Sequence, residues 1–484
     1  MDIESIEFEL ARLAKMVDIG RFDEALNGVD TLYAFINEGN ERNAVFFRIL
    51  SNIASIFIDV GHMKPCVESS QKGMDILSQY KDEVVEQIGD SAYFYNLSNA
   101  KSNLITEKNP FNHTFSTIEQ LVEVKKDLWK AIKSCGDIDS VKAKPTYFVN
   151  LGNNLKQQFR ISEALDCYER VNSLNLDIPQ SWINRSETLM MLNQVSNTHS
   201  IQMLEQIKNG YENVLSSQEI PPLWLEYYKQ QVAYHQNKIV EAYIDAEIEM
   251  DSHDFDKTKS EYNELGDYRK FCLDNNLSLS EHGLYCSCAG SSRDNLTIPT
   301  TGGVVGDFVV PMEMVLNRLK SEFSFARHLY FEYISEEQDY ELLHDSCFSE
   351  LFNDELLGID VEKLRTAFRS CFGILDKIAI AICELFDLYP PNGTVYFQSF
   401  WQLDRDNRRE KFNSHKSPGL LALYSIATDL NDKKGGEWSF FKQLRNDLEH
   451  EFVVVHKTDS PNDIYKEGLN NSPKSAIIRS SPDL

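Results

Sequence analysis

Apolar and small residues recur at helical spacing in the first half of the chain. The clearest series is Leu151, Gly152, Leu155, Phe159, Ala164, Tyr168 and Val171. Small side chains at Gly152 and Ala164 allow two antiparallel helices to approach closely, and Leu155 and Tyr168 fill the space between them. The series therefore predicts a pair of packed helices joined by a short turn.

Weaker copies of this pattern occur elsewhere in the first 200 residues. One spans residues 53–66, a half-copy spans 20–26, and residues 182–189 can begin a fourth. Together they resemble the tetratricopeptide repeat (TPR). Their spacing is uneven, so a generic helical bundle is the alternative. Repeated helix pairs favour an α-solenoid, whose long concave face would bind a protein or peptide ligand.

The composition and periodicity of the sequence change twice after the repeats. Residues 275–308 are rich in Gly, Ser, Thr and Asn, which predicts a loop-rich connector. Helical periodicity resumes over about 311–335, 361–386, 418–431 and 437–456. We therefore expect an all-α chain divided into a TPR-like domain (1–265), a connector (266–310), a helical domain (311–457) and a flexible polar tail (458–484).

The last predicted helix carries an apolar stripe and a polar edge. The stripe consists of Phe441, Leu444, Leu448, Phe452 and Val455. At about 100° per residue, His450 lies on the opposite side from this stripe, with Asn446 one turn before it. Arg445 flanks the stripe, and its long side chain can extend beside the other two groups.

The hexapeptide from Arg445 to His450 resembles the Arg-polar-x-x-x-His signature of HEPN ribonucleases. The resemblance implies that His450 transfers protons, that Arg445 binds the phosphate and that Asn446 supports them. It also implies a homodimer through the C-terminal domain, in which two copies of the motif share one cleft. Some HEPN toxins carry a tyrosine two residues after the histidine, whereas this chain has Phe452. TPR-like repeats joined to a HEPN domain resemble bacterial stress or anti-phage effectors.

These three residue types suit RNA cleavage without a metal. A histidine that titrates near neutrality can move protons to and from the reacting oxygens. An arginine fork can hold the non-bridging phosphate oxygens as charge develops on them. Glu322, on the first C-terminal helix, is a further candidate catalytic residue.

A basic segment at residues 405–416 is the second candidate for RNA contact. It contains Arg405, Arg408, Arg409, Lys411 and Lys416, against two acidic residues, in a chain of net charge −27. Tyr396, Phe397, Phe400 and Trp401 precede it, and basic groups beside aromatic rings suit single-stranded RNA. A solvated loop is the alternative.

Composition excludes several classes of protein. With 75 acidic and 48 basic residues, the chain does not coat nucleic acid or an anionic membrane over its whole surface. Its start lacks the layout of a signal peptide, and charged residues interrupt its apolar stretch at 371–389. Nine cysteines without a paired framework are expected to be reduced thiols, so we expect a cytoplasmic protein.

No cofactor or metal is expected from the motifs. His282, Cys286 and Cys288, with Cys272 upstream, are zinc-ligand types, but a C-x-C with one histidine lacks the paired clips of structural zinc sites. Gly302, Gly303 and Gly306 do not form a phosphate-binding loop, and neither a G-x-S-x-G nor an H-E-x-x-H motif occurs.

Two hypotheses follow. The first is a metal-independent endoribonuclease that is controlled by a TPR-like sensing or protein-binding domain. The second is a non-catalytic scaffold or regulator, whose HEPN-like domain only dimerises or binds RNA or nucleotide. Loss of function in a His450 variant would favour the first hypothesis, and loss confined to variants of the repeat domain would favour the second.

Overall fold

A computed structural model describes most of the chain. The described residues are 2–39, 42–108, 113–136, 143–196, 200–245, 255–298, 309–335, 355–356, 358–391, 393–450, 454–456 and 477–479. All structural statements below concern these residues. They divide into two compact units, which are described separately: unit 1 comprises residues 1–253 and 413–425, and unit 2 comprises 254–412 and 426–484.

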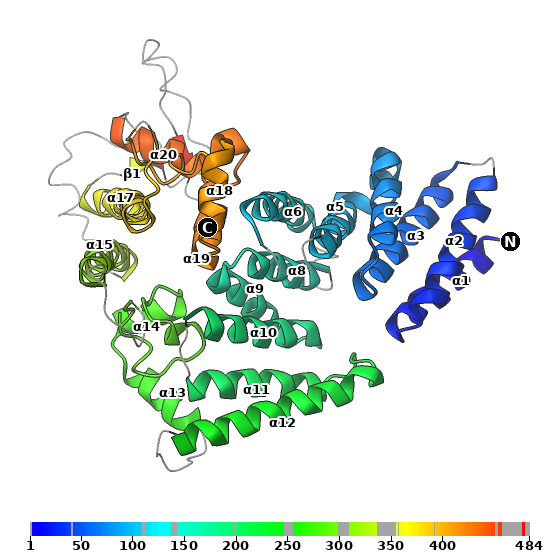
Figure 1. Ribbon diagram of the computed structural model, residues 1–484, viewed down its shortest axis with the longest axis horizontal. Helices are drawn as coiled ribbons and strands as arrows, with labels where there is room; N and C mark the ends of the chain where they lie inside the picture. The colour runs from blue at the N-terminus through cyan, green and yellow to red at the C-terminus, as the bar shows by residue number, and fades with distance from the viewer. Residues whose placement is uncertain are drawn as a thin grey trace, which may run out of the picture. The chain divides into compact units, whose positions relative to one another are not determined.

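The described residues are mostly helical, which confirms the predicted all-α class (Figure 1). The helices of the first half are α1 (Ile3–Asp18), α2 (Phe22–Glu38), α3 (Ala44–Met63), α4 (Val67–Gln79), α5 (Lys81–Lys108), α6 (Phe115–Lys133), α8 (Ala143–Gln157), α9 (Ile161–Ser173), α10 (Pro179–Ser196), α11 (Ile201–Ser216) and α12 (Pro222–Asp245). Those of the second half are α13 (Phe255–Glu264), α14 (Asp267–Asp274), η1 (His282–Leu284), α15 (Val309–Ser335), α17 (Ile359–Phe386), α18 (Asp406–Ser414), α19 (Pro418–Asp429), η2 (Asp432–Lys434) and α20 (Ser439–His450).

Three short strands form a small sheet in unit 2. β1 (Glu355–Leu356) pairs antiparallel with β2 (Val454–His456), which pairs parallel with β3 (Ile477–Arg479). The prediction of one helix over 437–456 is therefore wrong at its C-terminal end. Helix α20 ends at His450 and the β-branched run begins a strand, in agreement with the β-propensity of valine.

Each helix of unit 1 from α1 to α12 packs against the helices that precede and follow it in the chain. Figure 1 shows these helices side by side in chain order. Such nearest-neighbour packing agrees with the expected solenoid, because a solenoid repeat contacts only its neighbours. The assignment of the repeats to the TPR type stays a prediction.

Small residues make the close approach of paired helices possible. A Cβ placed on Gly152 of α8 would lie 2.6 Å from the ring of Tyr168 on α9, and Tyr168 is fully buried. In the pair α3 and α4, a Cβ on Gly61 would meet the Ser70 hydroxyl at 2.1 Å. The spacing of the sequence pattern thus reflects real helix contacts in these two pairs.

Polar side chains at the helix starts explain where several helices begin. The Asn43 side chain accepts the Phe46 backbone N–H at the start of α3, at 3.0 Å. Thr114 and Thr117 form a reciprocal capping box at the start of α6. Ser200 caps α11 in the same way as Asn43. Each cap satisfies a backbone donor that has no partner inside the helix.

Among the described residues, α3 is the one helix that is long and apolar enough to cross a bilayer. Two thirds of its most apolar window (67%) is buried in the structure. Ile53, Ala54 and Phe57 have no exposed surface and lie in the core of unit 1. The helix therefore has the burial of a core helix.

Within the predicted connector (266–310), residues 267–274 form helix α14 and residues 277–298 form a folded loop. Arg327 of α15 is 4% exposed, and its guanidinium donates to the Asp294 carboxylate at 2.6 and 2.9 Å and to the Leu277 carbonyl at 2.6 Å. Arg269 of α14 donates to the Ser292 carbonyl at 2.8 Å. These bonds hold residues 277–298, here called the anchored loop, against α14 and α15.

Helix α19 begins in unit 1 and ends in unit 2. Within unit 1, the Tyr424 hydroxyl donates to the Glu119 carboxylate, and its ring meets the Phe115 ring edge-on at 5.2 Å. The Ser425 hydroxyl donates to the Gln158 side chain at 2.5 Å and accepts from Arg160 at 3.3 Å. The sequence-based boundary at 265/266 does not foresee this contribution of residues 413–425 to unit 1.

Candidate functional site

Helix α20 packs on α17 through residues spaced four apart. The Phe441 ring lies 5.9 Å from the Phe368 ring, and the Arg445 guanidinium lies 5.9 Å from the Phe372 ring. Leu444 and Leu448 are half-buried, as Phe441 and Arg445 are, so the contact includes Phe441 of the predicted stripe and Arg445 beside it.

A cavity of about 290 Å³ opens beside this helix contact within unit 2. It is lined by Phe372, Leu375, Asp376, Tyr396, Phe397, Gln398, Ser399, Leu430, Lys442, Arg445 and Asn446. Two residues of the sequence motif, Arg445 and Asn446, thus line one cavity. Lys442 adds a second cation one turn earlier on α20, a contribution that the sequence reasoning did not identify.

The polar groups of this cavity favour an anion. Arg445 is half-buried, and its Nε–H is buried without a hydrogen-bond partner among the described residues. A buried donor without a partner costs free energy that a bound ligand oxygen would recover. Asp376 is the one carboxylate in the lining, and it accepts the Phe397 backbone N–H at 2.8 Å, which positions the loop that carries Tyr396.

His450 lies at the exposed C-terminal end of α20 and is not among the residues that line the cavity. Asp447, inside the same hexapeptide, is 7% exposed and accepts from the Gln443 amide at 2.6 Å. The structure therefore places two motif residues in the cavity and leaves the histidine in solvent.

Arg408 is not available to bind RNA, which corrects the sequence-based prediction. It is 8% exposed, and its guanidinium donates to the carbonyls of Trp401, Leu388, Phe400 and Tyr389 at 2.5–3.1 Å. Burial also lowers the pKa of Arg408. It is a structural clamp that joins the segment after α17 to α18.

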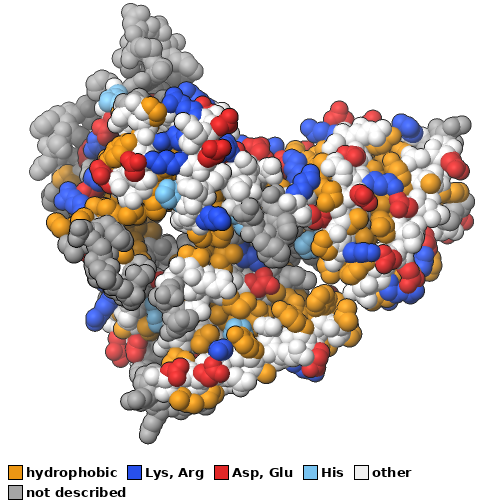
Figure 2. Space-filling view, viewed as in Figure 1, with side chains coloured by type: hydrophobic (Ala, Val, Ile, Leu, Met, Phe, Trp, Pro, Cys, Tyr) orange, Lys and Arg blue, Asp and Glu red, His pale blue; other side chains and the backbone are white. Residues whose placement is uncertain are grey.

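The other basic candidates differ in exposure and partners. Arg405, Lys411 and Lys416 are exposed, whereas Arg409 is half-buried and donates to the Leu403 carbonyl at 2.8 Å. Lys411 pairs with the Asp387 carboxylate at 2.9 Å. On the face shown in Figure 2, basic side chains are interspersed with acidic ones, without one continuous basic block.

Three of the four aromatic residues before the basic segment are core residues. Phe397, Phe400 and Trp401 are 0–3% exposed, so they cannot stack on RNA bases as predicted. Tyr396 is 55% exposed and lines the cavity, so it is the one ring of the four that a base can reach.

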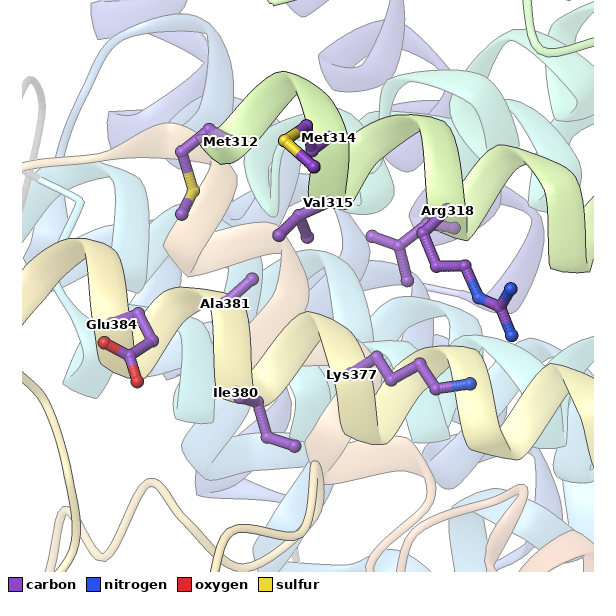
Figure 3. A pocket seen from close by; sticks show the side chains of 9 residues that line it. Met312, Met314, Val315, Arg318, Lys377, Ile380, Ala381 and Glu384 are labelled. Atoms are coloured by element: carbon purple, nitrogen blue, oxygen red, sulfur yellow. The ribbon is translucent and has the colours of Figure 1, made fainter. Parts of the chain in front are cut away.

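A second cavity, of about 340 Å³, lies between α15 and α17 (Figure 3). Met312, Met314 and Val315 of α15 face Ile380 and Ala381 of α17, and the cavity is mostly apolar. Glu322 lies beyond this groove. Its carboxylate pairs with Arg318 at 2.8 Å and with Lys377, and the Lys377 hydrogen bond lowers the pKa of Glu322. The Glu322–Lys377 pair links α15 to α17, whereas Arg318 and Glu322 both lie on α15, and Glu322 does not line the cavity of Arg445.

The side chains of His282, Cys286 and Cys288 converge in the anchored loop although their spacing is unlike that of common zinc motifs. Cys272 is buried in α14 and is not part of the cluster. The described cysteines form no disulfide with one another.

Comparison with known proteins addresses the C-terminal region. No curated protein matches the chain. Residues 306–475 match the family model described as LA2681-like HEPN, a range that contains α15, α17, α20 and the cavity of Arg445. The HEPN resemblance drawn from the Arg445–His450 hexapeptide is thereby confirmed at the level of the domain, and residues 306–475 form a HEPN-family domain.

Proposed function

We propose that the chain is a metal-independent endoribonuclease whose active site contains Arg445, Asn446 and His450. The observation that carries the proposal is the cavity within the HEPN-family domain that Arg445 and Asn446 line, with the buried and unpartnered Nε–H of Arg445 beside it. Lys442 and Tyr396 add a cation and an exposed ring, which are the groups that bind a phosphate and a neighbouring base.

The chemistry uses the 2′-hydroxyl of the RNA as its nucleophile. A histidine removes the proton from this hydroxyl as the oxygen attacks phosphorus, and the bond from phosphorus to the 5′-oxygen breaks. The leaving 5′-oxygen takes up a proton, so that the products carry a 2′,3′-cyclic phosphate and a 5′-hydroxyl. Arg445 and Lys442 offset the charge that develops on the non-bridging oxygens.

A homodimer would complete this site. One chain offers a single His450, which lies at the exposed end of α20 outside the cavity lining. Two proton transfers are needed, and a twofold axis beside α20 would bring a second His450 to the reacting phosphate. We therefore include dimerisation through the C-terminal domain in the proposal.

Control by the helical repeats would act through α19. The N-terminal part of this helix belongs to unit 1, where Tyr424 and Ser425 bond to Glu119 and Gln158. A protein or peptide that binds the repeats would change the activity if its affinity for the repeats differs between two arrangements of α19. A role in stress or phage defence is part of this proposal and rests on the domain combination alone.

The alternative function is a non-catalytic scaffold that binds RNA or nucleotide in the same cavity. The exposed position of His450, away from the cavity lining, is the observation that favours it. Binding would then need Arg445 and Lys442 but not His450, which separates the two functions experimentally.

The test is cleavage of mixed RNA by purified wild-type, His450→Ala and Arg445→Ala proteins in excess EDTA. We expect both variants to lose at least about 100-fold in rate, the usual contribution of a general acid–base or a charge-stabilising group. His328→Ala is the matched control, because His328 is also exposed and lies on α15. RNA binding that needs Arg445, without any cleavage, would support the alternative. Equal cleavage by wild-type and His450→Ala proteins would contradict the proposed role of His450.

A further inference from the structure

Three zinc-ligand side chains converge in the anchored loop, upstream of the HEPN-family domain. The imidazole of His282 and the thiols of Cys286 and Cys288 offer ligand atoms that all lie within 4.8 Å of one another. The Sγ of Cys288 lies 3.6 Å from Nε2 of His282. All three residues are half-buried, so a small ion can reach them from solvent.

A tight turn brings these residues together. The single 3₁₀ turn of η1 starts at His282, and the Cys286 backbone N–H donates to the His282 carbonyl at 3.0 Å. Gly283 permits this turn, because a Cβ there would lie 3.2 Å from the Ser291 carbonyl oxygen and 3.3 Å from Ser278. The His282 ring stacks on Tyr285 at 5.0 Å, which restricts the orientation of the imidazole.

The loop around the cluster is fixed independently of any metal. The Ser278 hydroxyl donates to the Ser291 carbonyl at 2.7 Å, and the Leu296 N–H donates to the Leu279 carbonyl at 3.0 Å. The ion pair between buried Arg327 and half-buried Asp294 ties the same loop to α15. Ligands held in place by such contacts lose little conformational entropy when an ion binds.

The ligand spacing fits tetrahedral zinc. Zn–S bonds of about 2.3 Å and Zn–N bonds of about 2.05 Å at the tetrahedral angle place a sulfur and a nitrogen ligand about 3.6 Å apart. The separation of Cys288 Sγ and His282 Nε2 has this value. Two thiolates and an imidazole also favour zinc over harder cations such as Mg²⁺ and Ca²⁺, which prefer oxygen ligands.

We propose that His282 Nε2, Cys286 Sγ and Cys288 Sγ bind one Zn²⁺ ion per chain. Binding forms three metal–ligand bonds, and the thiol protons leave to solvent, so no electron transfer is involved. The fourth position is open to water, because no fourth His, Cys, Asp or Glu among the described residues belongs to the cluster. Glu261 supports the turn from outside the cluster, since its carboxylate accepts the Ala289 N–H at 3.1 Å.

Spacing alone argued against this site, since C-x-C lacks the two-residue gap of the usual zinc clips. The structure nevertheless brings the three ligands together, because the turn of η1 places His282 next to the two cysteines. The ion would cross-link His282 to Cys286 and Cys288 within the anchored loop. It would thereby stabilise the loop between α14 and α15.

The test is the zinc content of the full-length protein, purified in the presence of zinc and measured by plasma mass spectrometry. We expect about one zinc per chain for the wild type and loss of most of it in His282→Ala and Cys288→Ser. Cys371→Ser is the matched control, since Cys371 is an exposed cysteine on α17, and it should keep the wild-type content.

Cobalt binding keeps the test decisive if a variant folds poorly. Wild-type protein stripped of metal and titrated with Co²⁺ should show a thiolate-to-cobalt charge-transfer band and the intense visible bands of tetrahedral cobalt, saturating at one ion per chain. A wild type that binds neither ion, or zinc content that is equal in Cys288→Ser and Cys371→Ser, would overturn the proposal. These readouts do not depend on RNA cleavage and remain valid if the proposed nuclease function fails.

Discussion

At the scale of single residues, burial and hydrogen-bond partners decide what a basic side chain can do. Arg408 and Arg445 both belong to motifs that the sequence offers as RNA contacts. The guanidinium of Arg408 is fully used by backbone carbonyls, whereas the Nε–H of Arg445 has no partner among the described residues and the side chain lines a cavity. Charge patterns in the sequence cannot distinguish these cases, because they do not show which cations the fold buries.

Arg408→Ala should destabilise the protein by about 3 kcal/mol, because it leaves several buried carbonyl groups without a donor. Arg405→Ala, which removes an exposed arginine three residues earlier, should change stability by less than about 0.5 kcal/mol. The free energy of unfolding in urea distinguishes the two variants. Equal stabilities would mean that the Arg408 contacts do not hold the fold.

The anchored loop gives a residue-scale prediction about pH. Burial by itself would raise the pKa of Asp294, but the Arg327 hydrogen bonds, the Leu279 N–H and the nearby charges of Arg327 and Arg269 lower it to about 2. A depressed pKa in the folded state means that the Asp294 carboxylate stabilises the fold above its unfolded pKa of about 3.9, and that this contribution is lost as the pH falls toward 2.

Asp294→Asn should therefore lower the free energy of unfolding by about 1–2 kcal/mol near neutral pH, after allowance for solvent screening. The difference from wild type should shrink between pH 4 and pH 2. Urea unfolding of both proteins at several pH values measures this difference in the free energy of unfolding. A difference that stays constant over this range would show that the charge of Asp294 is not the source of the effect.

At the scale of elements, the helical periodicity predicted several of the described helices, among them α15, α17 and α19, but it did not single out others, such as α5, α6 and α14. The pair α8 and α9 matches the series from Leu151 to Val171, because each position of that series is determined by contact across a two-helix interface. The end of α20 was not predicted correctly, since a helical stripe and a short strand can both include Val455. The burial of Phe400 and Trp401 was also missed, because base-stacking rings and core rings have the same composition.

Gly152→Ala tests the helix interface directly. The added Cβ would lie 2.6 Å from the ring of the fully buried Tyr168, so we expect a loss of about 1–2 kcal/mol despite the better helix propensity of alanine. Gly373→Ala is the control, because no atom lies within 4 Å of its added Cβ on α17, and it should gain up to about 1 kcal/mol. Thermal unfolding followed by circular dichroism compares them. A stabilised Gly152→Ala protein would contradict the packing.

At the scale of the whole molecule, the sequence predicted the helical class and the HEPN-family domain, but not how the chain divides. Residues 413–425 join unit 1 although they lie inside the HEPN-matched range, a long-range contact that local patterns cannot reveal. The candidate site was predicted in part, because Arg445 and Asn446 follow from the motif, whereas the cavity and Lys442 depend on the packing of α20 against α17.

Coupling between repeats and nuclease is testable at this scale. Tyr424→Phe removes the hydroxyl that bonds to Glu119 while it keeps the ring on Phe115. If α19 transmits control, this variant should change the rate of RNA cleavage several-fold without altering the Tm by more than a few degrees. Thr106→Val is the control, since it removes an exposed hydroxyl of unit 1 that bonds only within α5. An unchanged cleavage rate would remove α19 from the control mechanism.

The most direct test of the central claim uses an RNA that spans a mapped cut, prepared with and without a single 2′-deoxy substitution at that position. The proposed mechanism predicts that wild-type protein cuts only the all-ribose strand in EDTA, leaves a 2′,3′-cyclic phosphate, and loses this activity in Arg445→Ala. Cleavage of the 2′-deoxy strand, or ends that carry a 3′-hydroxyl, would contradict attack by the 2′-hydroxyl and with it the proposed function.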